Sequence, residues 1–331
     1  MTKRNSSLTH LPDIYQVIKP ELTQVEKQLK KATNSSIQII SDIGNYIFRE
    51  KGKRLRPALL ILSSKLLGYH GKEIIRFASV VEFIHTASLI HDDIVDNSSL
   101  RRGKEAIHSK WGSNVTVLLG DYLYILSIKL SLTNDNSRII QTLSEISTQM
   151  IEGEILEFHE NWNFDLNEEN YLEIIKKKTG SLFAGSCKIG AMLAQADSDQ
   201  EKALNDFGLN AGMAFQIIDD LLDFTSDEKT LGKPVLSDLK EGKITLPLIF
   251  TLKNNQKEKD KIIQLIKDKK WKKINTREII NTVAQNGALE YTYQKAREYI
   301  DKAKEKIELF SDSIYKKTLL SITDYIIERN K

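Results

Sequence analysis

The chain is poor in cysteine and proline, and its most apolar long segment is interrupted by charge. Cys187 is the single cysteine, so an intramolecular disulfide is excluded, and its small, apolar neighbours indicate a packed thiol in a reducing compartment, the cytoplasm. No apolar run follows the basic residues near the N-terminus, so no signal peptide is expected. The segment 115–132 contains Asp121 and Lys129, which argues against an integral membrane helix and predicts a buried core helix.

The chain also lacks a large excess of charge of either sign. The 48 basic and 45 acidic residues leave a formal charge of +3, too small an excess to favour nucleic acid as a partner. The long intervals between the five prolines are rich in helix-forming residues, and apolar residues recur at steps of three and four, as at Ile300, Ala303 and Ile307. No Asn-Gly turn lies between alternating runs. We therefore predict an all-α protein of ten or more helices in one domain, residues 1–331.

Two aspartate clusters stand out, DDIVD at 92–96 and DDLLD at 219–223. At about 100° per residue, the three aspartates of each cluster share an arc of roughly 100°, so each trio is expected to face one direction. Like charges at these spacings destabilise a helix unless a cation compensates them. Mg²⁺ prefers carboxylate oxygens and is usually held by one or two carboxylates together with substrate phosphates. The clusters therefore predict two acidic walls of one cavity that binds a phosphate-bearing molecule.

Each of these features also has a less specific interpretation. A single DDxxD is more often a solvated helix face, but two copies, each at the end of an apolar run, make that interpretation weak. The absence of a D-x-D-x-D-G loop excludes an EF-hand. The basic group KGKRLRP at 51–57 would, taken alone, be a surface patch, and His85, two helical turns before Asp92, would be a core histidine. Basic residues follow both clusters and complete a phosphate site: Arg101 and Arg102, whose guanidinium groups match phosphate geometry in bidentate fashion, and Lys233 and Lys243.

Six ordered blocks resemble the trans-isoprenyl diphosphate synthases, also called all-trans polyprenyl diphosphate synthases, over most of the chain. They are GKRLRP at 52–57, FIHTASLIHDDIVD at 83–96, LRRGK at 100–104, GD at 120–121, KTG at 178–180, and GMAFQIIDDLLDF…LGKP…DLKEGKITLP between 212 and 247. The resemblance implies the all-helical isoprenoid synthase fold, with both aspartate motifs across the mouth of a deep cavity. It also implies a prenyltransferase that condenses isopentenyl diphosphate with an allylic diphosphate, farnesyl or geranylgeranyl diphosphate.

The resemblance also implies roles for individual residues. Two to three Mg²⁺ ions would be held by Asp92, Asp93, Asp96, Asp219, Asp220 and Asp223. The allylic diphosphate would be contacted by Arg101, Lys178, Lys233 and Lys243, and isopentenyl diphosphate by Lys53, Arg56, His85 and Arg102. Thr179 and Gln216 would face the reacting carbons. The family further implies a homodimer, and release of a long product predicts peripheral contact with a membrane.

Product length is expected to depend on the helix that precedes Asp92. Ser88, four positions earlier, lies nearly under Asp92, and the resemblance adds Ala87, whose position carries aromatic rings in short-chain members. Both side chains are small here, and Ile84 is the larger residue near the next turn. A long product of about eight to ten isoprene units is predicted, C40–C50, suited to a quinone side chain.

Two other functions would share part of this sequence pattern. A class I terpene cyclase would share the fold and the first motif, but it usually carries a different second motif, whereas here the second motif ends in Asp223. A non-catalytic helical subunit would be expected to have lost acidic or basic members of the motifs, and all of them are present.

Overall fold

The computed structural model describes residues 10–49, 52–101, 103–132, 136–226, 235–254, 256–267 and 276–329. Two residues of the expected site, Arg102 and Lys233, lie outside these ranges. Apart from one short pair of strands, the regular elements of the described residues are helical, as the sequence predicts. The fold is the isoprenoid synthase fold.

The helices follow one another with short connections. In the first half they are α1 (Leu11–Ile14), the 3₁₀ turn η1 (Tyr15–Ile18), α2 (Lys19–Ala32), α3 (Gln38–Phe48), α4 (Leu55–Leu66), α5 (Glu73–Val95), α6 (Ile107–Trp111), α7 (Ser113–Ser131) and α8 (Ser137–His159). In the second half they are α9 (Glu168–Ile175), the π-helical turn η2 (Lys176–Gly180), α10 (Ser181–Leu193), α11 (Ser198–Thr225), α13 (Ser237–Lys240), α14 (Leu246–Asn254), α15 (Gln256–Lys267), α16 (Thr276–Gln285), α17 (Ala288–Ile307) and α18 (Ile314–Glu328).

A small antiparallel ladder lies directly after the first aspartate motif. Strands β1 (Leu100–Arg101) and β2 (Lys104–Glu105) pair with Leu100 opposite Glu105 and Arg101 opposite Lys104. The turn between them contains Gly103, whose φ of +73° favours glycine. The ladder fixes the direction in which Arg101 leaves the end of α5.

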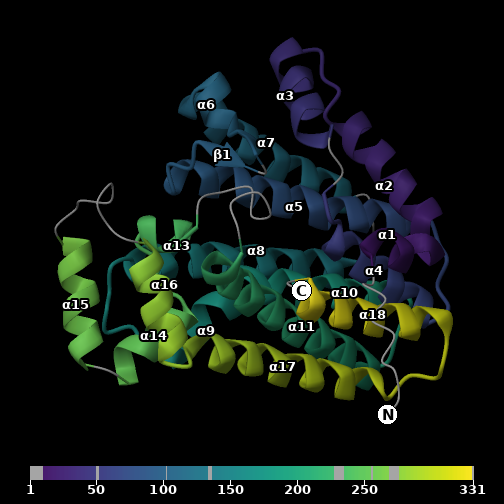
Figure 1. Cartoon of the computed structure of the whole chain (residues 1–331). Helices are drawn as coiled ribbons and strands as arrows, with labels where there is room; N and C mark the ends of the chain where they lie inside the picture. Colours follow the sequence, from purple (N-terminus) through teal and green to yellow (C-terminus); the bar gives the residue numbers. More distant parts are fainter. Residues whose placement is uncertain are drawn as a thin grey trace.

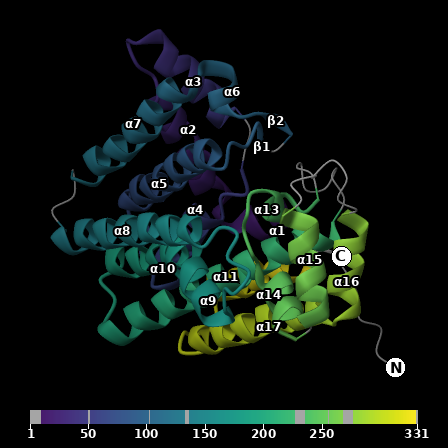
Figure 2. The ribbon, with the colours of Figure 1, turned by 90° about the vertical axis from the view of Figure 1, so that its left-hand side faces the viewer.

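Long helices cross the middle of the molecule in layers (Figure 1). In that view α5, α8, α10 and α11 lie across the centre, α3 and α6 lie above them, and α17 lies below. Turned by 90°, the molecule shows α5 above α8 and α10, and α14, α15 and α16 on the side of α11 and α17 (Figure 2). Helix α11 packs most extensively against α17 and α10.

The buried apolar side chains form two clusters. One gathers residues of α2, α4, α5, α7, α8, α10 and α18, and the other gathers residues of α9, α13, α14 and α16. Helix α11 contributes Phe207 and Ala211 to the first cluster and Ile217 and Ile218 to the second, and α17 is likewise shared. The interpretation of residues 1–331 as one domain stays a prediction, which this sharing supports.

Helix α5 is a core helix although its composition would allow it to span a membrane. Among the described residues it is the one helix that is long and apolar enough for this, and 67% of its apolar window is buried inside the protein. Its buried side chains extend around the helix and include Phe77, Val81, Phe83 and Ile84. Burial of this kind is typical of the central helix of a folded domain.

The prediction that residues 115–132 form a buried core helix is wrong in part. The segment is helical, as α7, but one side of it is open: Leu118 and Ile125 are 68% and 64% exposed, and Val117, Ile128 and Leu132 are also exposed. The opposite side, with Leu119 and Leu123, packs against α5. Hydrophobicity alone could not distinguish a helix covered by its own chain from one covered on a single side.

Candidate active site

The first aspartate motif lies at the C-terminal end of α5, where the three carboxylates have different surroundings. Asp93 is buried and accepts a hydrogen bond from Arg101 Nε at 2.5 Å, and Asp96 accepts one from Lys243 Nζ at 2.7 Å. The carboxylate of Asp92 makes no hydrogen bond or ion pair with the other residues that the structure describes. Burial raises the pKa of Asp92 to about 7, against the opposing effect of Lys178.

The second motif lies near the C-terminal end of α11, and its carboxylates meet three different neighbours. Asp219 is 47% exposed and pairs with Arg329 at 2.6 Å. Asp220 is buried and accepts hydrogen bonds from Tyr171 and Gln216. Asp223 is fully buried and accepts hydrogen bonds from the hydroxyl and backbone N–H of Ser237 and from the backbone N–H of Asp238. An arc of about 100° is wide enough to meet three different elements, so the three carboxylates have separate partners, and their facing one direction stays a prediction.

Two lysines and two glutamates form a charged cluster beside the first motif. Lys178 Nζ lies 2.5 Å from Glu157 and 2.6 Å from Glu154, and Lys243 Nζ lies 3.7 Å from the same oxygen of Glu157. Burial disfavours the charged form of both lysines, but the surrounding carboxylates outweigh burial and raise the pKa of each. Both ammonium groups therefore stay charged at the end of α5, where Asp96 also pairs with Lys243.

A close approach of α8 to the π-helical turn η2 fixes the position of Lys178. A Cβ atom added at Gly153 would lie 2.5 Å from the backbone nitrogen of Lys178, so only glycine permits this packing. Glu154 and Glu157 follow Gly153 on the same helix and therefore reach the Lys178 ammonium from α8. A small cavity of about 90 Å³ lies behind this group, lined by residues that include Glu157, Lys178, Gln216, Asp220 and Lys243.

Thr179 and Gln216 contact each other, and their facing the reacting carbons stays a prediction. The Thr179 hydroxyl donates to Gln216 Oε1 at 2.8 Å, and Gln216 Nε2 donates to Asp220 Oδ1 at 2.8 Å. The Tyr171 hydroxyl donates to the other oxygen of Asp220 at 2.6 Å. Burial raises the pKa of Asp220, and these two hydrogen bonds oppose the rise.

A second basic group lies around the rings of Phe183 and Phe215, whose centroids are 5.3 Å apart and whose planes are tilted by 37°. Arg56 lies over the Phe183 ring at 4.7 Å, and Arg329 and Lys53 lie over the Phe215 ring at 4.1 and 5.9 Å. Arg56 Nη1 donates to His85 Nε2 at 3.0 Å, which makes this ring nitrogen the acceptor. Burial lowers the pKa of Arg56 to about 10, so the guanidinium stays charged at neutral pH.

Some hydrogen-bond donors of this basic group lack an acceptor among the described residues. The Nε atom of Arg56 and the Nε and Nη1 atoms of Arg329 are buried without a partner among the described residues. Buried donors without acceptors are costly, so they mark a place where a ligand with several acceptor oxygens is stabilised. A diphosphate has such oxygens, and arginine matches them in bidentate fashion.

The three residues expected to set product length lie one to two turns before Asp92 on α5. Ile84 and Ala87 are buried, and Ser88 is half-buried and donates its hydroxyl to the backbone oxygen of His85 at 2.9 Å. The side chains at 87 and 88 are small, which leaves this side of α5 without an aromatic ring at these positions.

The carboxylates fit Mg²⁺ only in combination with a ligand that brings its own oxygens. Among the described residues, no group of three or more histidine, cysteine, aspartate or glutamate side chains is arranged to hold a metal ion by itself. Asp92 has no competing partner among them, and Asp219 is half-exposed, so each can offer one carboxylate. Mg²⁺ is commonly bound in this way, by one or two carboxylates and substrate phosphates.

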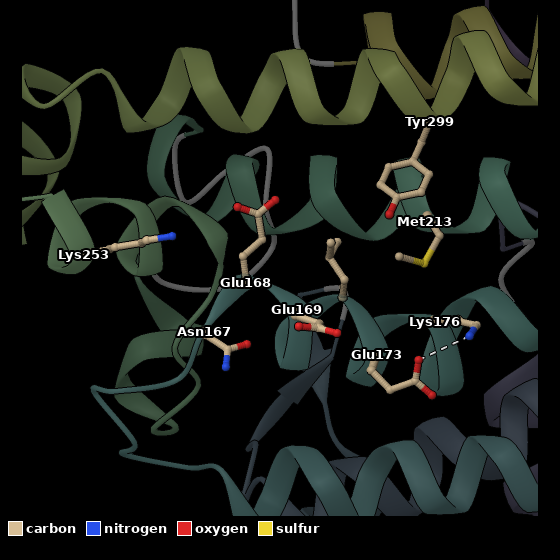
Figure 3. A pocket seen from close by; sticks show the side chains of 9 residues that line it. Asn167, Glu168, Glu169, Glu173, Lys176, Met213, Lys253 and Tyr299 are labelled. Carbon is tan, nitrogen blue, oxygen red and sulfur yellow. Dashed lines mark hydrogen bonds and ion pairs between the residues drawn. The ribbon is translucent and has the colours of Figure 1, made fainter.

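A larger cavity of about 540 Å³ lies away from the aspartates, between α9, α11, α14 and α17 (Figure 3). Its lining includes the apolar or aromatic side chains of Leu172, Met213 and Tyr299 and also carries both signs of charge, with Glu173 and Lys176 forming an ion pair at 3.2 Å. The basic side chains of its lining have acidic neighbours, and no unpartnered buried polar atom is found among the described residues that line it. Nothing in this cavity points to a particular ligand.

Sequence reasoning missed four residues of the site. Glu154 and Glu157, spaced three apart in a helix, could have been noticed as an acidic pair on one face. Tyr171 and Arg329 gave no signal, because an isolated tyrosine and a basic residue near a chain end are common. Each reaches the site from an element far away in the sequence, α9 or the end of α18.

Comparisons with known proteins agree with the site. The family model described as "Polyprenyl synthetase" matches residues 37–283. Octaprenyl diphosphate synthase of Haemophilus influenzae is 32% identical over 99% of both chains, and geranylgeranyl diphosphate synthase of Saccharolobus solfataricus is 33% identical over 94% of this chain and 96% of that one.

Solved structures give the same result. A polyprenyl synthase from Caulobacter crescentus, described as complexed with calcium and isoprenyl diphosphate, has a TM-score of 0.93 and 32% sequence identity, and the similarity covers 98% of this chain and 99% of that one. A family model that covers most of the chain and relatives matched over nearly their whole length leave one conclusion: the chain belongs to the polyprenyl synthetase family of prenyltransferases.

Proposed function

We propose that this trans-prenyl diphosphate synthase extends farnesyl or geranylgeranyl diphosphate to a product of about C40–C50, used for a quinone side chain. The observation that carries the proposal is the pair of small side chains at Ala87 and Ser88, one turn before Asp92. A growing prenyl chain that descends from the aspartates meets no aromatic ring at these positions. The relatives make octaprenyl as well as geranylgeranyl diphosphate, so length depends on such local differences.

The first step is ionisation of the allylic diphosphate. Bound Mg²⁺ supplies Lewis-acid stabilisation of the leaving pyrophosphate. Two to three Mg²⁺ ions would be held by carboxylates of the six motif aspartates together with the diphosphate oxygens, and Asp92 and Asp219 are the aspartates best placed to offer a carboxylate. Lys178 and Lys243, which carboxylates keep charged, contact the same diphosphate together with Arg101. As the C–O bond breaks, these cations stabilise the developing negative charge on oxygen.

The two residues outside the described ranges complete this assignment. Lys233 is assigned to the allylic diphosphate and Arg102 to isopentenyl diphosphate. Both assignments rest on the sequence motifs in which these residues lie, LGKP and LRRGK.

Isopentenyl diphosphate is assigned to the second basic group. Lys53, Arg56 and His85 hold its diphosphate, and the spare donors of Arg56 and Arg329 support the assignment because they lack partners. The double bond of isopentenyl diphosphate attacks the allylic cation through its terminal carbon, which leaves a tertiary cation on the neighbouring carbon. A proton then leaves the CH₂ group between this cationic carbon and the carbon that bears the diphosphate, a new double bond forms, and the released pyrophosphate accepts the proton. Thr179 and Gln216, which are hydrogen-bonded to each other, are assigned to face the reacting carbons.

The active unit is proposed to be a homodimer. Helices α7 and α8 expose large apolar side chains, among them Leu118 and Ile125 on α7 and Ile151, Ile155 and Phe158 on α8. A large exposed apolar patch commonly marks a protein interface, and a second copy of the chain offers the same patch, as a twofold dimer requires. Location in the cytoplasm and peripheral membrane contact during product release stay predictions.

The test is a product analysis. The purified protein is incubated with Mg²⁺, radiolabelled isopentenyl diphosphate, and either farnesyl or geranylgeranyl diphosphate, and the dephosphorylated products are separated by reversed-phase chromatography. The proposal expects C40–C50 products with both primers and none without Mg²⁺. Termination at C15 or C20 would contradict the long product, and absence of any elongation would contradict the synthase itself.

A further inference from the structure

Tyr171 lies at one end of a chain of hydrogen bonds that runs from α9 through α11 to η2. Its hydroxyl donates to Asp220 Oδ2 at 2.6 Å, Gln216 Nε2 donates to Asp220 Oδ1 at 2.8 Å, and the Thr179 hydroxyl donates to Gln216 Oε1 at 2.8 Å. Tyr171, Thr179 and Asp220 are buried, and Gln216 is half-buried. Tyr171 lies outside the sequence motifs, and none of these motifs explains why a tyrosine of α9 reaches the second aspartate motif.

The chemistry of the groups gives this chain of bonds one direction. Asp220 accepts from both the Tyr171 hydroxyl and the Gln216 NH₂ group, so the Gln216 carbonyl is the atom that accepts from Thr179. Tyr171 occupies one oxygen of Asp220 and thereby leaves the other oxygen to Gln216. Without the phenol, one oxygen of a buried carboxylate loses its donor, and Asp220 can rotate to seek another.

We infer that Tyr171 is a positioning residue, which acts through Asp220 to fix the orientation of the Gln216 amide and the Thr179 hydroxyl beside the reacting carbons. The inference rests on the proposed function, because it takes from that proposal the place where prenyl transfer occurs. Each oxygen of Asp220 has a second lone pair, so this role is compatible with metal binding by the same carboxylate.

The ring of Tyr171 also packs with Ile174 and Ile175 of α9 in the second apolar cluster. The positioning role belongs to the hydroxyl and the packing role to the ring, so Tyr171→Phe separates them. The chain offers a matched control, because the hydroxyl of Tyr291 donates to Glu168 Oε2 at the same distance of 2.6 Å. Glu168 lines the larger cavity away from the aspartates (Figure 3), so Tyr291→Phe removes an equivalent bond from a place without a catalytic role.

The kinetic experiment compares kcat and both KM values of the two variants with those of the wild type in Mg²⁺. Tyr171→Phe is expected to lower kcat about tenfold and to leave both KM values within about twofold, because the loss concerns the transition state rather than diphosphate binding. Tyr291→Phe is expected to stay within about twofold in every parameter. Equal behaviour of the two variants would overturn the inference, since a tyrosine–carboxylate bond would then matter no more here than elsewhere.

A double-variant comparison tests the route through Gln216. Tyr171→Phe is introduced into a Gln216→Leu background, in which the amide that Tyr171 orients is absent. The additional loss in kcat is expected to fall from about tenfold to less than about twofold, because coupled residues are not additive. The same tenfold loss in both backgrounds would show that Tyr171 acts independently of Gln216.

A third measurement needs neither metal nor turnover. In a crystal structure of metal-free Tyr171→Phe, the contact between Thr179 Oγ1 and Gln216 Oε1, 2.8 Å in the native protein, is expected to be lost. An unchanged contact would overturn the inference even if the activity falls. If the wild type fails to elongate any primer, the proposed function fails, and this structural measurement still decides whether Tyr171 orients Gln216.

Discussion

Replacing Asp92 by Asn is expected to stabilise the metal-free protein and at the same time to abolish most of its activity. Asp92 is a half-buried carboxylate without a hydrogen bond or ion pair to another described residue, and Glu154 and Asp96 add like charge near it. Burial raises its pKa from 3.8 to about 7. The asparagine has the same shape and carries no charge, so it avoids the cost of burying the carboxylate.

The sign of the pH dependence follows from the direction of this shift. The unfolded chain releases the Asp92 proton near pH 4, whereas the folded chain holds it until about pH 7. The wild type therefore loses stability as the pH rises through this window, and the full cost is present above pH 7. Since one pKa unit corresponds to about 1.4 kcal/mol, a rise of about three units sets an upper bound of about 4 kcal/mol.

The assay is thermal unfolding in EDTA at several pH values between 4 and 8. The melting temperature of Asp92→Asn is expected to equal that of the wild type near pH 4 and to exceed it by up to about 6 °C at pH 8, given about 2.1 cal/mol/K of unfolding entropy per residue. Asp312→Asn is the control, because this aspartate is 88% exposed and its loss is expected to change little at any pH. In Mg²⁺, turnover of Asp92→Asn is expected to fall at least about 100-fold, a loss of about 2.7 kcal/mol. A lower melting temperature at pH 8, or near-normal turnover, would refute the reasoning.

Four further predictions concern other parts of the molecule. Burial raises the pKa of Cys187 to about 12, so a disulfide exchange reagent at pH 8 is expected to leave the native thiol unmodified and to modify one thiol per chain in denaturant; rapid native modification contradicts this. Arg54→Leu removes the partner of the buried Glu82 and the partly buried Glu26 and is expected to lower the free energy of unfolding by about 3–5 kcal/mol, measured by urea titration, with a loss below about 1 kcal/mol as the contrary result. The variants Ala87→Phe and Ser88→Phe are each expected to shorten the products seen by chromatography, because moving a ring out of a packed wall costs about 1–3 kcal/mol. Unchanged products from both variants would show that other residues limit the length of the product. Leu118→Glu puts a charge on the exposed apolar side of α7 and is expected to convert a dimer into monomers in sedimentation experiments, whereas a monomeric wild type contradicts the dimer itself.

The helical class, the family and the acidic and basic motifs could be predicted from the sequence because each depends on local spacing. Apolar residues at steps of three and four define helix faces whatever lies against them, which is why the pattern at Ile300, Ala303 and Ile307 corresponds to the buried side of α17. The same local rule placed Gln216 one helical turn before Asp220, and the structure joins the two by a hydrogen bond. Motif residues far apart in the chain could be assigned to one site only through the resemblance.

Only the tertiary structure decided what covers each helix face and which groups pair across it. Spacing put Asp219, Asp220 and Asp223 on one arc, but packing gave them Arg329, Tyr171 and Ser237 as separate partners, from elements between 14 and 110 positions away. Likewise, the apolar residues of 115–132 predicted that the segment is helical but did not predict that one side of the helix is exposed. Local sequence sets the conformation of a helix and the residues on each of its faces, whereas the partners of those faces depend on how distant helices pack around a shared core.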